Sequence, residues 1–142
     1  MKVSARNQFS GTVQEVILGA VNAEVHISLP GGSLIIAVIT KDSIASLDVK
    51  VGKAVLALVK APQIILVTDF AGYKISARNQ LAGTVTAVKL GAVNAEVDLE
   101  LAGGQVIAAT VTNESINALG LAKGKTATAL FKAGAVILAV AE

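Results

Sequence analysis

The segment Gly19-Ala20-Val21-Asn22-Ala23-Glu24-Val25 recurs without change at residues 91–97, which is 72 positions further along the chain. Apolar and polar residues alternate from Val21 to Leu29, and the second copy alternates in the same way from Val93 to Leu101. A period of two is typical of a β-strand that buries one face. The stretch therefore predicts the same half-buried strand twice in one chain.

The duplication extends over nearly all of the 142 residues. Ser4-Ala5-Arg6-Asn7-Gln8 recurs at the same offset, and 35 of 70 aligned positions are identical without a gap. A repeat of this length predicts two copies of one structural unit. We place the units at residues 1–70 and 73–142, with the join at residues 68–73.

The pattern within each unit predicts five strands and one short helix. In the first unit the strands are expected at residues 2–18, as one long strand or two shorter ones, and at residues 21–29, 34–39, 54–60 and 64–67. Gly31-Gly32 forms a turn, and the apolar run Leu34–Ile39 is typical of a buried strand. Thr40 is a suitable N-cap for a helix in which Ile44 and Leu47 share one face. The order is that of a small Greek-key barrel, so the predicted fold class is all-β, with two OB-like five-stranded barrels in tandem.

The composition excludes disorder and favours assembly. Hydrophobic residues make up 54% of the chain, aromatic residues 3%, and the net charge is only +2. Every uncharged apolar stretch is shorter than the roughly 20 residues that a membrane-spanning helix needs. A unit of about 70 residues buries only about 60% of its unfolded surface. The apolar surplus therefore predicts faces that are buried between units and between chains, as in a homo-oligomer.

The residues that could catalyse a reaction are sparse. The chain has no cysteine, and its single histidine, His26, has Asp98 as its counterpart in the other copy. We interpret His26 as an exposed strand residue. Glu24 and Glu96 are retained, but one carboxylate per unit gives no acid/base pair, and a salt bridge or cross-strand hydrogen bond explains them. We therefore expect no enzyme, no catalytic residue and no metal bound directly by the protein.

Polar side chains that can donate hydrogen bonds are retained in both copies. They are Ser4, Arg6, Asn7, Thr40, Ser43 and Lys60, with counterparts at positions 76, 78, 79, 112, 115 and 132. A tetrahedral oxyanion has only acceptors and a charge, and it requires such a set of donors. Each residue also has a structural explanation, because Thr40 can cap the helix, Ser43 can bond to the backbone and Asn7 can stabilise a turn. The residues alone indicate an anion-binding site and nothing more specific.

Four ordered motifs, each present twice, resemble the Mop domain, the molybdate-binding domain of molbindins. They are the Ser-Ala-Arg-Asn-Gln start, the Gly-Ala-Val-Asn-Ala-Glu-Val stretch, the Thr-x-x-Ser-Ile segment and the Lys-Ala near each unit's end. The resemblance covers essentially the whole chain and implies two Mop domains in tandem. It leaves no segment for a DNA-binding helix-turn-helix or a transport ATPase, so neither of those functions is expected.

The resemblance implies a cytoplasmic protein that binds molybdate, and tungstate as its analogue, for molybdenum storage, buffering and homeostasis. The ligand would be held as an intact oxyanion at interfaces between units, without a further cofactor. Single-domain molbindins form hexamers, so a tandem protein is expected to form a homotrimer with six units. No membrane and no nucleic-acid partner is expected.

The resemblance also implies which residues bind the oxyanion. The first site would comprise Ser4, Ala5, Arg6, Asn7, Thr40, Lys60 and Ala61, with counterparts Ser76, Ala77, Arg78, Asn79, Thr112, Lys132 and Ala133. A second site, near the symmetry axis, would comprise Gly19, Ala20, Val21, Asn22 and Ser43, with counterparts Gly91, Ala92, Val93, Asn94 and Ser115. Pro62 stands where the second copy has Gly134, which could make the two copies unequal in affinity.

Two alternative hypotheses stay open. The first is an OB-type nucleic-acid-binding module, which would need basic and aromatic residues clustered on one face, although the chain has only one Tyr and three Phe. The second is a purely structural oligomer, in which the retained polar residues make only interface hydrogen bonds.

Overall fold

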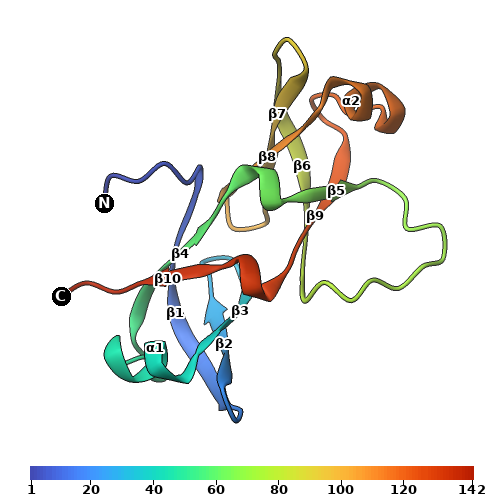
Figure 1. The fold of residues 1–142 in the computed structure, drawn as a ribbon. Coiled ribbons are helices and arrows are strands. Elements are labelled where there is room, and N and C mark those ends of the chain that lie inside the picture. The colour runs from blue at the N-terminus through green and yellow to red at the C-terminus, as the bar shows by residue number, and fades with distance from the viewer.

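A computed structural model describes residues 1–142 and shows two five-stranded antiparallel sheets (Figure 1). The first sheet has the order β10 (Ile137–Ala139), β4 (Ala54–Val59), β1 (Asn7–Leu18), β2 (Asn22–Ser28) and β3 (Leu34–Thr40). The second has the order β5 (Ile65–Val67), β9 (Thr126–Phe131), β6 (Asn79–Leu90), β7 (Asn94–Glu100) and β8 (Val106–Thr112). The helices are α1 (Lys41–Ser46) and α2 (Asn113–Leu119), and the 3-10 turns are η1 (Ala61–Gln63) and η2 (Ala133–Ala135). The predicted all-β, OB-like fold with one short helix per unit is confirmed.

Each sheet borrows its last strand from the other half of the chain. β10 comes from the second repeat and pairs with β4, with Leu138 opposite Ala57. β5 comes from the first repeat and pairs with β9, with Leu66 opposite Ala129. Each repeat therefore contributes four strands to one sheet and one strand to the other.

The alternating pattern that predicted β2 is confirmed with one exception. Ala23, Val25 and Ile27 are buried, but Val21 is 71% exposed. The Gly19 N–H donates to the Asn22 carbonyl, which closes a tight turn that places Val21 before the strand. The first strand also starts later than predicted, at Asn7. The prediction that β3 is buried holds for alternate residues only, Ile35 and Ala37, because β3 is the last strand of its sheet.

The predicted helix cap is present in both halves. The Ser43 N–H donates to Thr40 Oγ1 at 3.1 Å, and the Ser115 N–H donates to Thr112 Oγ1 at the same distance. Ile44 and Leu47 pack against the core on one face of the first helix. Neither helix has the length and apolar character that a membrane span requires.

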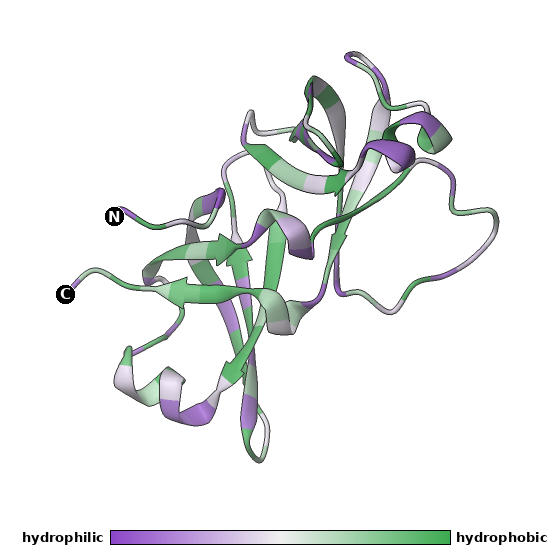
Figure 2. Ribbon diagram, turned by 45° about the horizontal axis from the view of Figure 1, so that its top comes forward, coloured by the Kyte–Doolittle hydropathy of each residue, from purple (hydrophilic) through white to green (hydrophobic).

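The two halves share one core. A single cluster of 28 buried hydrophobic residues includes members from both sheets, and hydrophobic residues run along the strands (Figure 2). The hairpin turns between β2 and β3 and between β7 and β8 also touch, because the side chain of Gln105 donates to the Pro30 carbonyl at 2.6 Å. A Cβ atom on Gly31 would lie 2.3 Å from Gly103 Cα, so this close approach requires glycine. The halves are therefore joined at strands, core and turns.

Candidate functional site

Strand pairing brings the two ends of the predicted oxyanion site together. β6 pairs antiparallel with β9, and its first residue, Asn79, lies opposite Phe131, the last residue of β9. The loop before β6 must therefore lie beside the residues that follow β9. The same geometry places Arg6 near Lys60, since Asn7 lies opposite Val59.

Five predicted residues of the second copy line one surface pocket of about 380 Å³. These residues are Ser76, Ala77, Arg78, Lys132 and Ala133. The rest of the lining is Gly134, which the sequence analysis noted as the counterpart of Pro62, and Ile75 and Val38 of β3, which it did not single out. Val38 comes from the other half of the chain, so the pocket lies between the two halves. Thr112 and Asn79 do not line this pocket.

The pocket offers hydrogen-bond donors that nothing else in the chain uses. The backbone N–H groups of Ser76, Ala77 and Arg78 and the Ser76 hydroxyl make no hydrogen bond within the chain. The exposed Lys132 ammonium has no carboxylate within ion-pair distance. No acidic side chain lines the pocket. This arrangement suits an anion that carries only acceptors.

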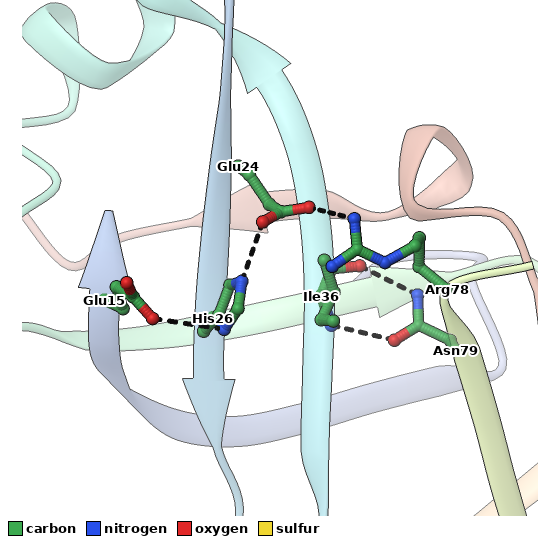
Figure 3. A network of polar contacts seen from close by, with 6 residues as sticks. All are labelled: Glu15, Glu24, His26, Ile36, Arg78 and Asn79. Atoms are coloured by element: carbon green, nitrogen blue, oxygen red, sulfur yellow. Dashed lines mark hydrogen bonds and ion pairs between the residues drawn. The ribbon is translucent and has the colours of Figure 1, made fainter. Parts of the chain in front are cut away.

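Each predicted arginine is paired with a glutamate from the other half. Arg78 Nη1 donates to Glu24 Oε1, and Arg6 Nη2 donates to Glu96 Oε1 (Figure 3 shows the first pair). The expectation that the retained glutamates form salt bridges is thus confirmed. Each pair uses one of the five N–H groups of a guanidinium, and both arginine side chains are more than half exposed.

His26 is not the exposed strand residue that the sequence predicted. Its side chain is only 17% exposed, with Nε2 2.9 Å from Glu24 Oε2 and Nδ1 3.6 Å from Glu15 Oε2. The hydrogen bond from His26 lowers the pKa of Glu24, helped by the Arg78 guanidinium and opposed by partial burial. No group of three or more acidic, histidine or cysteine side chains is arranged to hold a metal ion.

The side chains of Asn7 and Asn79 form hydrogen bonds that join the two halves. Each is 1% exposed. The Asn79 amide donates to the Ile36 carbonyl and accepts from the Ile36 N–H, both at 2.8 Å. Asn7 makes the same pair of bonds to Ala108 on β8, at 2.9 and 2.7 Å. Each amide uses its oxygen and one of its two N–H groups for this junction.

The residues predicted for the second site form a neighbouring cluster, whose pocket shares Val38 with the Arg78 pocket. Gly19 and Asn22 line a pocket of about 310 Å³ that also contains Glu24 and Val38. The backbone N–H groups of Ala20 and Val21 make no hydrogen bond in the chain. Thr40 lies opposite Asn22 in the β2–β3 register and bonds to Ser43, so it belongs to this cluster and not to the Arg6 and Lys60 cluster.

The second half differs from the first around this cluster at positions that the sequence analysis did not notice, since Lys89 and Thr110 stand where the first half has Ile17 and Val38, which line the pocket. Asn113 stands where the first half has Lys41, and its side chain donates to the Gly91 carbonyl at 2.9 Å. Its backbone N–H donates to the Val93 carbonyl, just as Lys41 N–H does to Val21. A comparison of the aligned repeats could have flagged this change from a cation to a neutral amide.

The chain is similar to several known proteins. Residues 3–66 and 75–138 each match the family profile of the TOBE domain. The chain is 46% identical over 140 residues to the molybdenum transport protein ModE of Herbaspirillum seropedicae and to the molybdenum-pterin-binding protein MopA of Rhodobacter capsulatus. In both comparisons the match covers 99% of this chain. The chain spans only about half the length of these relatives, 52% and 53%.

A solved structure is similar over the whole chain. The cytoplasmic molybdate-binding protein ModG, in a crystal form with molybdate bound, is 53% identical and superposes with a TM-score of 0.97. The match covers 99% of this chain and 100% of that chain.

Proposed function

This chain belongs to the TOBE-domain family, with two such domains in tandem, and on that premise we propose that it binds molybdate as an intact oxyanion. The observation that carries the proposal is the pocket between the halves, where unpaired donors of Ser76, Ala77, Arg78 and Lys132 meet without an acidic lining residue. Its similarity to ModG, which binds molybdate, supports the choice of anion. The protein's role is binding and not catalysis.

The proposed mechanism needs no bond from the protein to molybdenum. The four oxygens stay on the metal and accept hydrogen bonds from the Ser76 hydroxyl and the backbone N–H groups, while Lys132 and Arg78 balance the charge. Ser4, Arg6 and Lys60 provide the equivalent donors in the first half. Selection against sulfate comes mainly from pocket size, because both ions are tetrahedral dianions with the same acceptors.

A second kind of site is proposed at the turn of Gly19–Asn22, with Ser43, and at its counterpart in the other half. The free N–H groups of Ala20 and Val21 support this placement. Glu24 lines the same pocket and carries a negative charge. An anion in this second site is therefore repelled by Glu24, and cations from outside the pocket must offset that charge. The first site has Arg78 and Lys132 for this purpose.

We further propose a homotrimer of six units that stores and buffers molybdate, with tungstate as an alternative ligand, in the cytoplasm. Exposed apolar residues recur at equivalent positions of the two halves, as expected for surfaces that are repeated in a symmetric assembly. A ligand bound at the unit interfaces would stabilise the assembly by mass action.

Titration calorimetry of the whole protein with molybdate, tungstate and sulfate tests the proposal. Molybdate and tungstate should bind, and sulfate should bind far more weakly. Replacing Arg6→Ala together with Arg78→Ala should weaken molybdate binding by about tenfold or more, because a desolvated dianion loses charge-assisted partners. Lys123→Ala, which removes an exposed cation outside the pockets, is the control. Equal affinity for sulfate, or unchanged affinity in the double variant, contradicts the proposal.

A further inference from the structure

The arginine of each proposed oxyanion site is bonded to a glutamate from the other half of the chain. Arg78 precedes β6, and the glutamate that holds it is on β2. Glu24 lies opposite Val38 in the β2–β3 register, and Val38 lines the Arg78 pocket. The carboxylate is therefore at the rim of the pocket, bonded to the arginine but outside the lining.

We propose that Glu24 and Glu96 are positioning residues, which hold Arg78 and Arg6 in the orientation that the oxyanion needs. This inference rests on the proposed molybdate function. A long side chain that is half exposed has many rotamers, and fixing it before the ligand arrives reduces the entropy lost on binding. Anchoring one amino group leaves the remaining guanidinium N–H groups for the anion.

The two positioning carboxylates are not equivalent. Both oxygens of Glu24 are engaged, Oε1 by Arg78 and Oε2 by His26, and Glu15 lies on the far side of the imidazole (Figure 3). A β-bulge between Val13 and Glu15 shifts the register and places Glu15 opposite His26. The chain thus fixes this carboxylate from two sides.

The second half lacks this support. Asp98 replaces His26, and Ala87 replaces Glu15. Asp98 cannot donate a hydrogen bond to Glu96 when both are ionised, so Glu96 is held by Arg6 alone. Arg78 is therefore the better positioned of the two arginines, and its pocket is the tighter of the two.

Positioning and simple charge repulsion make opposite predictions for Glu24→Ala. Removing a negative charge near an anion site strengthens binding if charge alone matters. Removing a positioning group weakens binding. The sign of the change in molybdate affinity therefore decides between the two.

The experiment uses the whole protein with Arg6→Ala, so that the Arg78 pocket dominates calorimetry with molybdate. Adding Glu24→Ala should weaken binding by about fivefold or more, whereas Glu24→Gln, whose side-chain oxygen can still accept from Arg78, should retain most of the affinity. Glu96→Ala is the matched control, because its arginine partner is already absent. In an Arg78→Ala background, Glu24→Ala should not weaken binding further, because no arginine is left to position, and removal of its charge from the Gly19–Asn22 pocket can only favour the anion there.

A spectroscopic measurement separates positioning from loss of structure. The NMR signal of the Arg78 Nε–H should show a rigid side chain in the parent protein and a mobile one after Glu24→Ala, while the backbone spectrum keeps its dispersion. His26→Ala should weaken molybdate binding in the Arg6→Ala background and leave it unchanged in the Arg78→Ala background. The Arg6→Ala protein should also bind molybdate more tightly than the Arg78→Ala protein.

The outcomes are distinct. No heat from the unaltered protein with molybdate overturns the proposed function and this inference together. Molybdate binding that stays equal or becomes tighter after Glu24→Ala, in a folded protein, overturns the inference alone. Equal losses from Glu24→Ala and Glu96→Ala in the Arg6→Ala background also overturn it, because they would show a general structural effect.

Discussion

At the scale of single residues, the two buried asparagines have the most specific structural task. Each amide replaces a short piece of strand, since it donates to and accepts from one backbone residue of an edge strand in the other half. Each amide thereby pairs one residue of an edge strand, Ile36 of β3 or Ala108 of β8, without a further strand. Asparagine suits this position because its amide carries the same donor and acceptor as a peptide group.

Asn79→Ala is expected to destabilise the protein by about 1–3 kcal/mol, because it leaves the Ile36 N–H and carbonyl without partners. Urea denaturation followed by circular dichroism measures the change. Asn117→Ala, an exposed asparagine of α2, is the control and should change the free energy of unfolding by less than about 0.5 kcal/mol. A negligible effect of Asn79→Ala would mean that water replaces the amide at no cost.

The lowered pKa of Glu24 implies that the stability of the folded protein depends on pH. Its pKa is lower in the folded protein than in the unfolded chain, chiefly because of the hydrogen bond from His26. A lowered carboxyl pKa stabilises the fold above the unfolded pKa of about 4.3, and that contribution is lost as the pH falls through the folded pKa. Melting temperatures of the parent and Glu24→Gln proteins between pH 7 and pH 3 should therefore converge in acid. A constant difference over this range would contradict the assignment.

The residues that line the oxyanion pocket were easier to predict from the sequence than the ion pairs around it. The resemblance to the Mop domain implied that Ser76, Arg78 and Lys132 belong to one site, and the antiparallel pairing of β6 with β9 brings them to one pocket. The Arg78–Glu24 pair could not be predicted, because it joins residues 54 positions apart, one on β2 and one in the loop before β6. His26 was misjudged because only the bulge in β1, which has no sequence signature, places Glu15 opposite it.

At the scale of elements, the exchange of β5 and β10 between the two sheets cannot be predicted from the repeated sequence. The registers Ile137 opposite Leu58 and Ile65 opposite Leu130 are the same pairing in the two halves. Because the repeats are alike at these positions, pairing within a half and pairing between halves satisfy the same side chains. Sequence patterns predict the strands and their registers, but they cannot decide which copy supplies the partner.

Engineered cysteines test the exchange, since the chain has no cysteine of its own. Leu56→Cys with Ala139→Cys should form a disulfide within one chain, because the two residues are register partners and cross-strand Cα atoms lie about 4.5–5.5 Å apart. Leu56→Cys with Val67→Cys should not, although pairing within a half would bring those residues together. Mass spectrometry of the non-reduced protein distinguishes the pairs, and crosslinking of the second pair alone would contradict the exchange.

At the scale of the whole molecule, apolar surface recurs in equivalent places. Leu18 and Leu90 are 60% and 69% exposed, and Ile65 and Ile137 are 61% and 60% exposed. Scattered exposed apolar residues are ordinary. Their repetition at the same positions of both halves indicates that the two halves use these residues for the same kind of contact. These exposed residues account for part of the high hydrophobic content of the chain.

Leu18→Glu combined with Leu90→Glu should dissociate the proposed trimer, because each charge would be buried without a partner at an interface. Sedimentation equilibrium should give three times the 14.3 kDa chain mass for the parent protein and a smaller mass for the variant. Lys123→Glu, which adds a negative charge at an exposed polar residue, is the control and should leave the mass unchanged. A monomeric parent protein would contradict the trimer. An unchanged mass in the double variant would show instead that the assembly uses another face, and Ile65 with Ile137 would then be the pair to change.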